Sequence, residues 1–197
     1  TAIALQGNEL YVGRTGVAAG FPMPATGTGA VHVFSRNSAG TWVESGSFAG
    51  SDVTLNDGFG SSLAVDGSIV AVGAPTGEVG GVVYVFEKKG TGWSQVARLV
   101  AADAKKDDDF GRTVTLKGGM LAIGAPSRDS TRGAIYVSSR NAQGGWSAPV
   151  VVASGSEPWD GIGTSITFDG GRALVGVPGP LSFSDSPEAP KTRTGAV

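Results

Sequence analysis

A phrase that recurs about every 51 residues constrains this chain more than any other feature of its sequence. Phe59-Gly60 returns as Phe110-Gly111 and, with one substitution, as Ile162-Gly163. Gly-Ala-Pro or Gly-Val-Pro follows each pair at a constant distance. The repeated positions are Phe59, Gly60, Gly73, Pro75, Phe110, Gly111, Gly124, Pro126, Gly163, Gly176 and Pro178. Self-similarity at a fixed period indicates a protein assembled from copies of one structural unit.

Each unit predicts four antiparallel β-strands. In the unit after Phe59, Leu63 and Val65 alternate with small or polar residues, as in a strand with one buried face. Asp66-Gly67 then forms a two-residue hairpin turn, and the apolar runs IVAVG and VVYVF follow. Four strands in about 50 residues are typical of a β-propeller blade. We expect an all-β propeller with blades near 1–56, 57–107, 108–159 and 160–197, the last one partial, and with Phe59 and Phe110 buried.

Composition excludes several classes of function. Fifteen Lys and Arg residues face 17 Asp and Glu residues, so no basic surface for nucleic acid is expected. The chain has no cysteine, which excludes a disulfide framework, a thiolate metal site and a cysteine nucleophile. No apolar run approaches the roughly 20 residues of a membrane-spanning helix, and no signal peptide is visible.

The recurring motifs resemble the FG-GAP repeats of integrin α-subunit propellers and of many bacterial surface proteins. The resemblance covers about three and a half copies and implies a ring of about seven blades, an extracellular or cell-surface location, and partner binding. The partial fourth copy then indicates a piece of a longer chain, or a ring closed by a partner chain. Many FG-GAP blades carry a calcium loop of the form DxDxDGxxD. The corresponding places here hold only LQGN, VDGS, LKGG and FDGG, so we expect no calcium and no other cofactor.

Most chemically suggestive residues have a structural interpretation in the repeat register. His32 aligns with Tyr84 and Tyr136 in the third strand, which favours a spacer over a catalytic base. The recurring Trp42, Trp93 and Trp146 favour packing at the start of the fourth strand.

A recurring aspartate precedes the Phe-Gly pair in three units. Asp57, Asp108 and Asp160 each lie two residues before that pair, where a carboxylate bonds backbone amides of a turn. Asp52 and Asp103 also coincide in register, and the same interpretation extends to them. We therefore expect neither catalytic nor metal-binding residues.

The loops that do not repeat indicate where a partner binds. The connections 14–28 and 179–194 are long and rich in proline, and alternating strand direction places both on one rim of the disc. Trp159 belongs to the same rim, and it is either a binding anchor or a plug between adjacent blades. The candidate partner-binding residues are Phe21, Met23, Trp159, Leu181 and Phe183.

These observations favour a non-catalytic binding or structural module that makes protein contacts in adhesion or surface assembly, with a protein partner or a neighbouring subunit. One alternative is a lectin-like propeller with carbohydrate pockets. Another is a propeller appended to an enzyme domain outside this stretch. A multivalent lectin would repeat polar and aromatic residues in corresponding loops, and the loops here differ, which favours protein contact.

The loop assignment predicts the effect of replacing Phe21 and Phe183 with Ser. Assembly with the partner should weaken while thermal unfolding stays nearly unchanged, because both side chains are assigned to the partner rather than to the core. A loss of several kcal/mol in unfolding free energy would instead identify the loops as packing elements.

Overall fold

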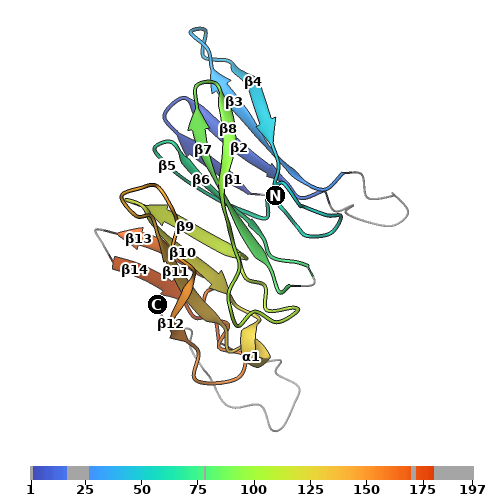
Figure 1. The fold of residues 1–197 in the computed structure, drawn as a ribbon, viewed down its shortest axis with the longest axis vertical. Coiled ribbons are helices and arrows are strands. Elements are labelled where there is room, and N and C mark those ends of the chain that lie inside the picture. Colours follow the sequence, from blue (N-terminus) through green and yellow to red (C-terminus); the bar gives the residue numbers. More distant parts are fainter. Residues whose placement is uncertain (1, 17–26, 78, 170–171, 180–197) are drawn as a thin grey trace.

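The computed structural model describes residues 2–16, 27–77, 79–169 and 172–179. Three four-stranded antiparallel sheets and one hairpin make up these residues, and they follow one another in chain order (Figure 1). The first sheet holds β1 (Ile3–Gln6), β2 (Glu9–Arg14), β3 (Ala30–Arg36) and β4 (Trp42–Phe48). The second holds β5 (Ser62–Asp66), β6 (Ile69–Ala74), β7 (Val82–Lys89) and β8 (Gly92–Leu99). The third holds β9 (Thr113–Lys117), β10 (Met120–Ala125), β11 (Ala134–Ser139) and β12 (Val150–Ser154), and the hairpin pairs β13 (Ser165–Asp169) with β14 (Arg172–Gly176).

This architecture confirms the prediction of four-stranded propeller blades. In each complete sheet every strand pairs with its neighbours in the sequence, and the first strands β1, β5, β9 and β13 lie next to one another. The one helical segment among the described residues is α1 (Arg128–Thr131), and Asp129 and Ser130 within it have left-handed backbone angles. No helix in the described part of the chain is long and apolar enough to span a membrane.

The core consists of apolar side chains between consecutive sheets. Strand β6 is buried along its whole length because it is covered on both faces. Val70 and Val72 pack with Tyr11 of the first sheet, whereas Ala71 packs with Leu121 of the third. The predicted burial of the repeat phenylalanines is confirmed, since Phe59 and Phe110 are both inaccessible to solvent. Each Phe-Gly phenylalanine therefore belongs to an interface between blades.

The recurring tryptophans pack as predicted in two blades and not in the first. Trp93 lies edge-on to Tyr11, with ring centroids 5.5 Å apart, and Trp146 packs against the core between the second and third sheets. Trp42, in β4 of the first described sheet, is instead 38% exposed.

The expectation that the fourth strand begins at the tryptophan is wrong for the third blade. There, β12 begins at Val150, and Trp146 forms only an isolated bridge with Arg140. Pro149 lies between them and has no N–H to donate to the ladder, which accounts for the interruption.

The repeat glycines mark the closest approach between blades. A Cβ atom added to Gly73 would lie less than 3.0 Å from the carbonyl oxygen of Gly111 in the next blade, and the pair Gly124 and Gly163 repeats this geometry. The Ser62 hydroxyl donates a hydrogen bond of 2.7 Å to that same Gly111 carbonyl. A residue with a side chain at position 73 would therefore separate two blades.

This close approach predicts a strong effect of Gly73→Ala. We expect the substitution to lower the free energy of unfolding by about 1–3 kcal/mol or more, since overpacking here displaces backbone rather than a flexible side chain. The measurement is urea unfolding followed by tryptophan fluorescence. Gly46→Ala is the matched control, because Gly46 also lies in a strand but its added Cβ meets nothing within 4 Å. Equal stability of the two variants would contradict this account of the blade interface.

Candidate functional site

The connections between blades share a tight turn at the same repeat position, and we call these three turns the rim turns: Thr54–Asp57, Lys105–Asp108 and Glu157–Asp160. In each, the N–H of the fourth residue donates to the carbonyl of the first, at 3.4, 3.2 and 3.2 Å respectively. The third residue has a positive φ in all three, namely 74° for Asn56, 67° for Asp107 and 70° for Trp159. The second residue does not, so the backbone follows the pattern of a type II turn.

The recurring aspartates hold the rim turns from within, as predicted. Asp57 accepts the N–H of Thr54 at 2.6 Å, and Asp108 accepts the N–H of Lys105 at 2.8 Å. Asp160 accepts the N–H of Glu157 at 2.9 Å, and it is buried, as Asp108 is. The aspartates therefore fix the backbone of each turn.

The two central residues of each rim turn are exposed, and they differ from blade to blade. The first turn presents Leu55 and Asn56, the second presents a lysine and an aspartate, and the third presents a proline and a tryptophan. One backbone geometry thus carries three different pairs of side chains on the same rim.

A tyrosine–aspartate–arginine cluster lies beside the first rim turn. The Tyr84 hydroxyl donates a hydrogen bond of 2.8 Å to Asp52, and Arg98 Nε contacts the other carboxylate oxygen at 2.8 Å. The hydrogen bond from Tyr84 and the charge of Arg98 lower the pKa of Asp52. Burial and the bond to Asp52 raise the pKa of Tyr84 to about 12.

The third blade repeats this cluster with an arginine from a different place. The Tyr136 hydroxyl donates to Asp103 at 2.9 Å, and the guanidinium of Arg128 contacts Asp103 at 2.6 Å. Burial and Asp103 together raise the pKa of Tyr136. Arg128 comes from the loop after β10 and lies 5.9 Å from the centre of the Tyr136 ring. Arg98 comes from β8, opposite Tyr84 in the sheet.

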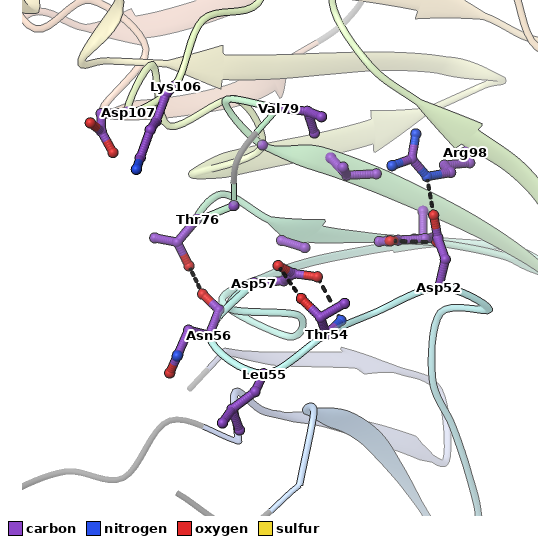
Figure 2. A pocket seen from close by; sticks show the side chains of 15 residues that line it. Asp52, Thr54, Leu55, Asn56, Asp57, Thr76, Val79, Arg98, Lys106 and Asp107 are labelled. Atoms are coloured by element: carbon purple, nitrogen blue, oxygen red, sulfur yellow. Dashed lines mark hydrogen bonds and ion pairs between the residues drawn. The ribbon is translucent and has the colours of Figure 1, made fainter.

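An open pocket of about 680 Å³ lies between the first two rim turns, and we call it the rim pocket. Figure 2 shows Leu55 and Asn56 on one side of it and Lys106 and Asp107 on the opposite side. Val79 also lines it, and the loop that contributes Val79 carries glycines at positions 77, 80 and 81 instead of an arginine that would reach inward. The pocket therefore combines exposed apolar surface with two cationic and three acidic residues.

Comparison with protein-family models identifies the repeat. The FG-GAP repeat model matches residues 42–86, from β4 into β7, and residues 93–138, from β8 into β11. The chain contains FG-GAP repeats. FG-GAP repeats are typically extracellular modules of protein–protein interaction. No curated protein matches the chain.

The place of the FG-GAP calcium loop does not fit a calcium ion in this chain. Gln6 exchanges two hydrogen bonds with Gly67 of the next blade, at 2.7 and 2.8 Å. Asp66 accepts the N–H of Gly118 at 2.7 Å in the same way. These hairpin residues therefore join neighbouring blades and supply few free oxygens. Across the described ranges, no three acidic or histidine side chains gather into a group that could hold a metal ion.

His32 lies at the tyrosine position of the first blade, as the repeat register predicts. It is opposite Val12 and Ser47 in the sheet, just as Tyr84 is opposite Val72 and Arg98. Its Nδ1 lies 2.7 Å from Glu44 Oε1 on the neighbouring strand.

The predicted partner-binding residues are only partly within the described structure. Trp159 is described and is 64% exposed, so it does not fill the space between the described blades. Phe21, Met23, Leu181 and Phe183 lie outside the described residues, as do the centres of both long loops. Sequence reasoning missed the rim pocket, since Leu55, Val79 and Lys106 belong to no motif and only the alignment of Asp52 with Asp103 marked its edge.

The Asp52 cluster predicts a pH-dependent stability. Because the folded-state pKa of Asp52 is lowered, its contribution is fully present above the unfolded-state pKa of about 4 and is lost as pH falls through the folded-state value. Asp52→Asn should therefore be less stable than the wild type at pH 7, by less than about 1 kcal/mol because the pair is half exposed. Chemical unfolding between pH 7 and 3 should show this difference shrinking. Asp107→Asn, a change at an exposed turn tip, is the control, and a difference that stays constant down to pH 3 would contradict the assignment.

Proposed function

We propose that this FG-GAP chain is a non-catalytic binding module, acting outside the cell or on its surface, that contacts a protein partner at the rim pocket. It serves adhesion or surface assembly. The observation that carries the proposal is the set of rim turns, in which one fixed backbone presents three different pairs of exposed side chains. Variable side chains on a rigid scaffold are the usual arrangement of binding loops.

Rigidity of the rim supports this function. Asp57 accepts two hydrogen bonds from Thr54, and the N–H of Thr76 donates to the Asp57 carbonyl at 3.1 Å. A turn that is already fixed loses little conformational entropy when a partner binds. The favourable free energy of contacts at the exposed tips is therefore not offset by the cost of ordering the turn.

The chemistry of the rim pocket suits a protein surface. Leu55 and Val79 are 46% and 47% exposed, and both line the rim pocket. An apolar partner side chain placed between them would lose water from both surfaces. Lys106 and Asp107 on the opposite side offer one charge of each sign, which provides orientation and partner selection.

A lectin-like propeller is the main rival, and the rim turns discriminate against it. A lectin with pockets repeated around the ring needs the same side chains at each turn. Here the same backbone position carries Asn56, Asp107 and Trp159. In the third blade, moreover, Arg128 lies over the tyrosine beside the turn, an arrangement without a counterpart in the second blade.

The experiment is selection of a random peptide display library on the purified protein. We expect enriched peptides whose affinity falls about tenfold or more in the double variant Leu55→Asp, Val79→Asp, because two charges would have to be desolvated in the complex. Val152→Asp is the matched control, since Val152 is similarly exposed but lies on the outer strand β12. Its affinity for the same peptides should be unchanged.

Two results would overturn the proposal. One is the absence of any peptide that discriminates the double variant from the control. The other is binding of immobilised glycans that depends on Leu55 and Val79, which would assign the rim pocket to a lectin.

A further inference from the structure

Trp159 occupies a backbone position that disfavours its residue type. It is the third residue of a rim turn, where φ is 70° and glycine or asparagine is the usual choice. The other two rim turns have Asn56 and Asp107 there, two of the residue types that tolerate this region best. A bulky aromatic residue is strained in it, and strain of this kind persists where function requires it.

Packing does not account for the tryptophan. Its side chain is 64% exposed, and it belongs to neither of the two core clusters. The turn itself is held by Asp160 and not by the indole. The core of the described residues therefore does not use the aromatic ring at position 159.

A second strained segment lies next to this turn. Asp129, Ser130 and Thr131 have φ values of 52°, 57° and 61°. The segment is tied to the connection that follows Trp159, because the N–H of Gly161 donates to the Thr131 carbonyl at 2.8 Å and Ile162 donates to the Arg132 carbonyl. Four of the seven non-glycine residues with positive φ in the described ranges thus lie in these two adjoining segments.

The surroundings of Trp159 are polar. Ser156 and Glu157 are exposed on its own turn, and Asp129 and Ser130 are exposed on the neighbouring segment. Asp129 and Arg132 are 3.4 Å apart at their charged groups and are both accessible. Contacts around a protein hot spot exclude water, whereas exposed hydroxyl, carboxylate and guanidinium groups lie in this neighbourhood.

We propose that Trp159 is the stacking platform of a carbohydrate subsite. The C–H face of a pyranose ring carries partial positive charge and complements the negative face of the indole. The hydroxyl groups at the ring edge require donors and acceptors, and the accessible Arg132 and Asp129 of the neighbouring segment are the candidates for these roles. This subsite goes beyond the protein contact proposed above and shares no residue with the rim pocket, so either proposal can fail without the other.

Trp159→Asn is the decisive variant, because asparagine already occupies the same position in the first rim turn. We expect the wild-type protein to retain a subset of sugars on an array of immobilised mono- and oligosaccharides, and the variant to lose about tenfold or more in affinity. The variant should also melt about 2–4 °C higher, since the strain is relieved and no core contact is lost. Asp129→Asn should weaken binding without changing the melting temperature.

Trp42→Asn is the matched control, because Trp42 is another partly exposed indole, and its removal should leave sugar binding unchanged. A second arm compares a glycoprotein before and after enzymatic removal of its glycans. Binding only before removal, or binding to free oligosaccharides, supports the proposal and identifies the source of the sugar. The proposal is overturned by no sugar binding, by equal sugar binding of Trp159→Asn, by a lower melting temperature of that variant, or by Trp159-dependent binding that survives glycan removal.

Discussion

The contact on which this structure depends is the one between a glycine of one blade and a carbonyl oxygen of the next. Gly73 faces Gly111, and Gly124 faces Gly163, with no room for a Cβ atom. This contact sets how closely two sheets approach near the first strands. Interdigitation of the apolar faces follows from that spacing, since side chains can fill the interface only when the sheets are at the right distance.

The same contact also positions the connections that form the rim. The Phe-Gly glycine lies at the end of a connection, and the N–H of Gly60 donates to the Gly73 carbonyl at 3.0 Å within its own blade. Each connection is therefore anchored at its end and braced by its aspartate, and the turn between them does not depend on its tip residues for stability. That independence allows the tips to differ between blades while the scaffold stays constant.

The repeat in the sequence was sufficient to predict the blades, the buried phenylalanines and the bracing role of Asp57, because each depends on residues at a fixed spacing. It could not predict the rim pocket, which depends on side chains that do not repeat. The repeat also did not predict the exposure of Trp159, because the sequence shows an aromatic residue but not the positive φ of its turn. The 38% exposure of Trp42 was not predicted either, because the repeat gives Trp42 the same position as Trp93 and Trp146.

The two tyrosine–aspartate pairs differ in the element that supplies their arginine, and the surface of the rim beside them differs as well. Each carboxylate has an arginine beside it in addition to the tyrosine hydroxyl, and both partners stabilise its negative charge. In the second blade the cation is Arg98, which comes from the strand opposite and leaves the loop above free to be short and rich in glycine. In the third blade residue 151, which faces the tyrosine in the corresponding place, is a valine, and Arg128 must reach inward from the loop. A carboxylate paired with an arginine is thus found beside an open pocket in the second blade. In the third blade the arginine of the pair lies over the tyrosine ring instead.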